Sequence, residues 1–133
     1  MKVIANVERA PGEKNYSCLL TVKPINGTVL GCGSSAKAAI EDMLKGWNET
    51  TEYLREEGEK VPTLEIEYRF DVGSLFSYYD FVNIAGVARE IGLNPSVIRQ
   101  YVIGTRKPSA ERKKQIITGL KSLADKMQQA VLY

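Results

Sequence analysis

Apolar and polar residues alternate in the first part of the chain, with the period of two that is typical of a strand with one buried face. The alternation runs through residues 2–9 and 16–22, and a shorter apolar segment covers residues 28–33. The stretches between them have the composition of turns, and the second contains the hairpin signal Asn26-Gly27. We therefore expect an antiparallel meander of three strands. Its expected buried face consists of Val3, Ala5, Val7, Tyr16, Cys18, Leu20 and Val22.

The pattern then becomes helical. Ser34 or Ser35 is positioned to cap a long helix, and Gly58 and Pro62 end it. Residues 64–70 return to alternation and predict a fourth strand. The order β-β-β-α-β predicts an α+β fold in which one helix covers one face of a sheet. The apolar positions expected to face that core are Ala36, Ile40, Met43, Trp47, Leu54, Leu64, Ile66, Tyr68 and Phe70.

The second half of the chain keeps helical periodicity but is divided by glycines. Residues 72–82 predict a short first helix, and Asn83 is a candidate cap for a second helix that ends at Gly92. Asn94 caps a third helix, which Gly104 ends. Two helices joined by about four residues that include a glycine are typical of a helix-turn-helix. The expected inward residues are Leu75, Phe76, Tyr79, Val82, Val87, Ala88, Ile91, Leu93, Val97, Ile98 and Tyr101.

The third of these helices contains residue types that read DNA. The second helix of a helix-turn-helix enters the major groove, where Arg pairs with guanine and Gln with adenine. Basic residues after the helix contact phosphates without reading sequence. A plain helical hairpin with solvent-exposed polar residues is the alternative, and the complete spacing favours DNA binding. The candidate DNA-binding residues are Asn94, Ser96, Arg99, Gln100, Arg106 and Lys107.

A last helix is expected after the candidate cap Ser109. Its apolar stripe either packs entirely on the helix-turn-helix or uses its distal part to pair with a second copy of the chain. A homodimer, or a higher homo-oligomer, would present two recognition helices to a two-fold operator. The stripe consists of Ile116, Leu120, Leu123, Met127 and Ala130 or Val131.

Charge separates the two halves of this 133-residue chain. Residues 1–72 contain nine Lys or Arg against twelve Asp or Glu, whereas residues 73–133 contain nine against four, giving net charges of −3 and +5. We interpret this asymmetry as two domains with different partners, residues 1–71 and residues 72–133, and the basic domain favours nucleic acid.

The sequence argues against an enzyme, a metal site and a cofactor. It contains no histidine and no CxxC pair, and we expect Cys18 and Cys32 to be buried, reduced thiols. A metal-dependent nuclease is a competing hypothesis, but neighbours such as Glu41 and Asp42 diverge on a helix. We also expect no signal peptide and no transmembrane helix, and hence a cytoplasmic protein.

The stretch "IAGVAREIGLNPSVIRQYVIGTRKPS" resembles the Cro/repressor-type, Xre-like helix-turn-helix. The resemblance includes Ala88, Gly92 and the Gly-x-Arg-x-Pro pattern of Gly104, Arg106 and Pro108. The β-β-β-α-β half resembles the partial RNase H-like domain of HicB-type antitoxins.

The resemblance implies an antitoxin of a type II toxin-antitoxin system. Its N-terminal domain would neutralise a small RNA-cleaving toxin with a dsRNA-binding-like fold, and its C-terminal domain would repress its own operon. The sequence departs from the HicB pattern, because "KPINGT" stands where a "PDLPGC"-like turn is usual and the helix is longer. A second interpretation is a stand-alone transcriptional regulator whose N-terminal domain oligomerises or senses a ligand.

Overall fold

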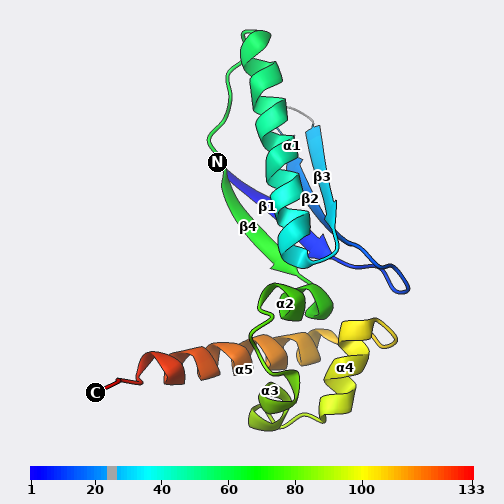
Figure 1. Ribbon diagram of the computed structural model, residues 1–133, viewed down its shortest axis with the longest axis vertical. Coiled ribbons are helices and arrows are strands. Elements are labelled where there is room, and N and C mark those ends of the chain that lie inside the picture. The colour runs from blue at the N-terminus through cyan, green and yellow to red at the C-terminus, as the bar shows by residue number, and fades with distance from the viewer. Residues whose placement is uncertain (24–26) are drawn as a thin grey trace.

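The computed structural model describes residues 1–23 and 27–133. It has mixed α+β character, as expected (Figure 1). Four strands form one sheet, one helix lies between the third and fourth strands in sequence, and four helices follow the fourth strand. The strands are β1 (Lys2–Glu8), β2 (Tyr16–Val22), β3 (Gly27–Gly33) and β4 (Glu65–Phe70). The helices are α1 (Ala36–Glu56), α2 (Val72–Tyr78), α3 (Ile84–Glu90), α4 (Pro95–Ile103) and α5 (Ala110–Gln128).

The sheet has the strand order β3-β2-β1-β4. The predicted meander is confirmed, because β1 pairs antiparallel with β2 and β2 pairs antiparallel with β3. Strand β4 returns after α1 and pairs parallel with β1. Gly27 already belongs to β3, opposite Val22, and Asn26 of the predicted hairpin signal lies outside the described residues.

Helix α1 packs on one face of the sheet, mainly over β2 and β3. Its N-cap is Ser35, whose hydroxyl accepts a hydrogen bond from the Ala38 N–H at 3.1 Å. The helix lies very close to β3, because a Cβ atom on Gly31 would clash with the backbone of Ala39 and Met43. The first core contains the predicted positions Val3, Ala5, Val7, Tyr16, Cys18, Leu20, Val22, Ala36, Ile40, Met43 and Trp47, together with Ala39.

The prediction that both cysteines are buried is wrong for Cys32. Cys18 is buried, whereas Cys32 is exposed. Since Gly31 faces α1, the next residue of the strand points to the opposite face of the sheet, which α1 does not cover.

The four helices after β4 form a second core. Its buried residues are Val72, Phe76, Val87, Ala88, Leu93, Ile98, Tyr101 and Ile116. Two details of the sequence prediction are wrong. Helix α2 ends at Tyr78, so Tyr79 is its C-cap and is exposed, and α5 ends at Gln128, so Ala130 and Val131 lie beyond the helix.

Hydrogen bonds between residues distant in sequence join the two halves. The Ser74 hydroxyl, at the start of α2, donates to the Val7 carbonyl of β1 at 2.6 Å. Just beyond the same end of β1, the Arg9 guanidinium donates from Nη2 to the Val102 carbonyl of α4 at 3.1 Å. These contacts hold α2 and α4 against the end of the central strand.

In the part of the chain that the structure describes, no helix is long and apolar enough to cross a membrane.

Candidate nucleic-acid interface

Helices α3 and α4 form a helix-turn-helix with four residues between them. The Asn83 carboxamide caps α3 by accepting from the Gly86 N–H at 2.9 Å. Gly92 has a φ of 79°, a left-handed conformation that favours glycine, and so permits the sharp exit from α3. Leu93 follows it and is buried in the second core. Fully buried Ala88 adds little bulk where α3 meets α4.

Helix α4 is capped at both ends as the sequence predicts. The Asn94 side-chain oxygen accepts from the Ser96 N–H at 3.0 Å and from the Ser96 hydroxyl at 2.9 Å. At the other end, Gly104 is left-handed, with a φ of 93°, and its N–H donates to the Gln100 carbonyl at 3.0 Å. Hydrogen bonds therefore fix both the first and the last residue of α4.

One face of α4 is exposed and carries the candidate base-reading residues. Ser96, Arg99, Gln100 and Ile103 follow the i, i+3, i+4, i+7 spacing that places residues on one side of a helix, and all four are exposed. Ile98 and Tyr101, on the opposite side, are buried. Asn94 is exposed at the start of the helix, and Arg106 and Lys107 are exposed in the segment after it. The structure thus puts all six candidate residues in solvent, on or next to α4.

Sequence reasoning missed a contribution from the loop between β1 and β2. Beyond the Arg9 bond to Val102, the loop residue Pro11 lies against Gly104, where a Cβ atom would be 3.4 Å from the Pro11 Cα. The Arg9 guanidinium also lies over the Tyr16 ring, 4.8 Å from its centroid. The end of α4 is therefore held by the sheet as well as by the other helices. More than ninety residues separate Arg9 from Val102, and no local pattern signals this contact.

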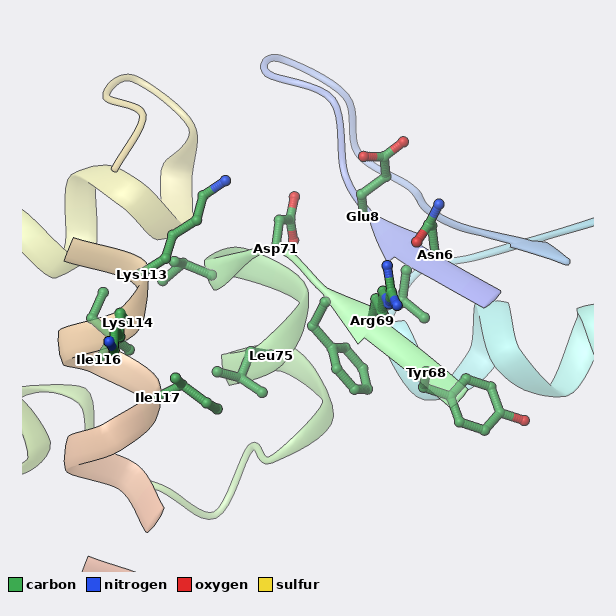
Figure 2. A pocket seen from close by; sticks show the side chains of 13 residues that line it. Asn6, Glu8, Tyr68, Arg69, Asp71, Leu75, Lys113, Lys114, Ile116 and Ile117 are labelled. Atoms are coloured by element: carbon green, nitrogen blue, oxygen red, sulfur yellow. The ribbon is translucent and has the colours of Figure 1, made fainter. Parts of the chain in front are cut away.

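A cleft of about 590 Å³ lies between the sheet and α5 (Figure 2). Glu8 and Asp71 come from the sheet side, while Lys113 and Lys114 come from α5, so the lining has both signs of charge. The Asp71 carboxylate already accepts from the Ser74 N–H at 2.8 Å, as the cap of α2. Within residues 1–23 and 27–133, no group of three His, Cys, Asp or Glu side chains is arranged to hold a metal ion.

The uncovered face of the sheet carries an apolar patch. Leu19 lies opposite Leu30 in the β2–β3 register and opposite Asn6 in the β1–β2 register. Leu30 is 59% exposed, and Leu19 and Ile4 are also exposed. These three residues make this face a candidate contact site for another protein.

The comparisons with known proteins add no relative to this description. The chain matched no family model, no curated protein and no solved structure.

Proposed function

We propose that this protein binds operator DNA through α4 and represses transcription of its own operon. The observation that carries the proposal is the exposed face of α4, with Ser96, Arg99 and Gln100 on one side of a helix that is capped, buried on its other side and preceded by a tight turn. A helix presented in this way fits the major groove of B-DNA.

The six residues divide between two roles. Arg99 offers two donors to the O6 and N7 atoms of guanine, and Gln100 offers a donor and an acceptor to the edge of adenine. Exposed Ile103, on the same face, suits contact with a thymine methyl group. Arg106 and Lys107 supply charge to phosphates, which raises affinity for every sequence. Asn94 and Ser96 stand at the N-terminus of α4, where free N–H groups suit a phosphate.

We further propose that the protein is an antitoxin, whose sheet half binds a small RNA-cleaving toxin protein. Two observations support this part. The β-β-β-α-β order of the sheet half resembles that of the partial RNase H-like domain of HicB-type antitoxins, and Ile4, Leu19 and Leu30 give its open face an apolar patch. The half also has the negative net charge that attracts a basic RNA-binding protein.

Fluorescence anisotropy with DNA from upstream of the protein's own gene tests the DNA part. Arg99→Ala should weaken binding to the preferred site by about 1–3 kcal/mol and relax specificity at one base pair. Lys107→Ala should weaken all sequences about equally and reduce the slope of log affinity against log salt by about one. Lys45→Ala, an exposed charge on α1, is the control and should change neither quantity. Unchanged operator binding in both α4-side variants would refute the assignment.

Co-expression with the product of the adjacent gene tests the toxin part. We expect the two proteins to co-purify and the toxin's RNA cleavage to stop. A Leu19→Asp/Leu30→Asp double variant should release the toxin while keeping operator affinity, and Ile103→Asp, on α4, is the matched control that should keep the toxin. Operator binding without any co-purifying partner would instead support a stand-alone transcriptional regulator.

A further inference from the structure

An apolar groove of about 560 Å³ lies between α2 and α5. Phe76 and Val87 of the second core lie at its base, and Phe81 and Met127 stand at its edges. Those two edge residues are among the most exposed large side chains of the chain, at 79% for Phe81 and 73% for Met127. The groove shares Phe70, Leu75 and Ile117 with the cleft of Figure 2 and is its apolar continuation.

This surface is incomplete as it stands. Of the 19 residues of α5, Ile116 is the one that is buried, and the distal half of the helix extends beyond the other helices (Figure 1). An isolated helix end is marginal in water, and contiguous apolar surface on a soluble protein usually marks a contact site. The distal turns of α5 therefore lack the packing that would normally stabilise them.

The charges around the groove indicate which partner fits it. Lys121 lines the groove, Asp125 follows Ala124 of its wall, and Asp80 precedes Phe81, so both signs occur around it. A groove that binds nucleic acid needs a basic rim, and a groove that binds a basic toxin needs an acidic rim. A second copy of the chain brings the same mixed charges, which can pair across a two-fold axis.

The shape of the surface gives a second reason for self-association. The patch combines a socket, the groove itself, with projecting apolar groups, Phe81 and Met127. A two-fold interface uses the same surface on both subunits, so it needs a surface that is complementary to itself. On α5, Ile117 and Met127 lie at equal distances in sequence on either side of position 122, and Leu120 and Ala124 do the same. An antiparallel α5–α5 pair centred there would place large residues opposite each other at its ends and Leu opposite Ala near its middle.

We propose that the groove binds a second copy of this chain. The distal half of α5 and Phe81 from each subunit pack into the groove of the other and form a two-fold dimer. Helix α4 lies beside the N-terminal end of α5, and the distal half of α5 points to the other side (Figure 1). Dimerisation through this groove leaves the exposed face of α4 free in both subunits.

Sedimentation velocity on the full chain, without DNA, tests the dimer over about 1–100 µM. Wild-type protein should sediment as a dimer in concentration-dependent exchange with monomer. Met127→Glu and Phe81→Glu should each raise the dimer dissociation constant at least tenfold. Since both side chains are exposed in the single chain, circular dichroism and Trp47 emission of the variants should match those of the wild type. The control is Leu30→Glu, an equally drastic change in the apolar patch on the sheet, and it should stay dimeric.

A second measurement locates the interface directly. In a Cys32→Ser background, a mixture of Leu120→Cys and Ala124→Cys proteins should form a mixed intermolecular disulfide under mild oxidation, because the antiparallel pair places position 120 opposite position 124. A mixture of Leu120→Cys and Lys45→Cys proteins should not, because Lys45 is exposed on α1. A wild-type protein that stays monomeric at 100 µM would overturn the proposal. The groove would then be covered by the chain's own C-terminal residues or by another protein. Loss of the dimer in Leu30→Glu alone would overturn it too, and would assign the interface to the sheet. None of these readouts depends on operator binding, so the dimer and the DNA proposal fail separately.

Discussion

The two halves of the molecule solve the problem of burying apolar surface differently. In the sheet half (residues 1–71), a 21-residue helix closes over the sheet, and residues such as Leu20 and Met43 are fully buried. In the helical half (residues 72–133), helices α2, α3 and α4 have only seven, seven and nine residues, and α5 leaves most of its length exposed. The first half buries its core under one long helix and leaves Ile4, Leu19 and Leu30 exposed on the other face of the sheet, whereas the second half leaves the apolar groove beside its own core open.

This difference has a physical origin. Helices shorter than about 12 residues are marginal in water without tertiary contacts. Helices α2 to α4 therefore depend on their caps, on one small core and on the sheet half, to which Ser74 and Arg9 connect them. We expect the helical half to be the less stable of the two. Single substitutions should therefore change the unfolding of one half more than that of the other.

The largest effect is expected from Gly31→Ala in the sheet half. The added Cβ would meet backbone atoms of Ala39 and Met43, so α1 must move off β3. We expect a loss of about 3 kcal/mol or more of unfolding free energy, from overpacking that side-chain adjustment cannot relieve. Thermal unfolding followed by the emission of Trp47, the single tryptophan, measures it.

Gly86→Ala in α3 is the matched control for this substitution. There the added Cβ would be 3.6 Å from its nearest neighbour, an ordinary contact. Because alanine favours a helix interior over glycine, we expect a gain of about 0.5–1 kcal/mol. Equal destabilisation by both substitutions would contradict the close approach of α1 to β3.

Ile98→Ala should unfold the helical half selectively. Ile98 is fully buried in α4, and its truncation should cost about 2–5 kcal/mol. We expect helical circular dichroism and operator binding to fall at a lower temperature than the Trp47 signal. Ile103→Ala, on the same helix but 60% exposed, should stay within about 0.5 kcal/mol of wild type. If both probes shift together in Ile98→Ala, the two halves unfold as one unit.

Ser74→Ala tests the junction between the halves. It removes the buried hydroxyl that donates to the Val7 carbonyl, and we expect a loss of about 1–3 kcal/mol. The melting curves of the two probes should also separate further than in the wild type. Ser17→Ala removes an exposed hydroxyl with a 3.4 Å bond to the Glu8 carbonyl and should have little effect. A Ser74→Ala protein that melts like the wild type would show that this bond does not couple the cores.

The smallest effect concerns the two cysteines. At pH 8 a thiol reagent should label exposed Cys32 quickly and Cys18 slowly, because burial raises the pKa of the Cys18 thiol from 9.0 to about 11. The same shift means that, between pH 9 and 11, Cys18 loses its proton in the unfolded chain but keeps it in the folded one. Stability should therefore decline over that window, and Cys18→Ala should reduce the decline while Cys32→Ser leaves it unchanged. Fast labelling of two thiols in the native protein would contradict the burial of Cys18.

Local chemistry made much of this fold predictable. The caps Ser35, Asn83, Asn94 and Ser109 and the left-handed Gly92 and Gly104 depend on hydrogen bonds within a few residues, and all of them lie where the sequence places them. The alternation in β1 and β2 likewise identifies the buried face, because each has one face toward α1.

Properties that depend on contacts between distant segments were not predictable. The exposure of Cys32 follows from how closely α1 approaches Gly31, and the exposure of Tyr79 from where α2 leaves the helical path. For the candidate site, the pattern identifies which face of α4 is exposed, but not that Arg9 and Pro11 support its end. Such contacts are set by tertiary packing, which the periodicity of the sequence does not predict.

The contact of Arg9 and Pro11 with the end of α4 has a thermodynamic consequence. A protein that bound the sheet and shifted the β1–β2 loop would change the free energy of the α4 arrangement, and with it the proposed affinity for DNA. Linkage is reciprocal, because the coupling free energy belongs to both ligands at once. If the two proposed partners bind, the operator would alter the affinity for that protein by the same factor, so that binding of one would report on the presence of the other.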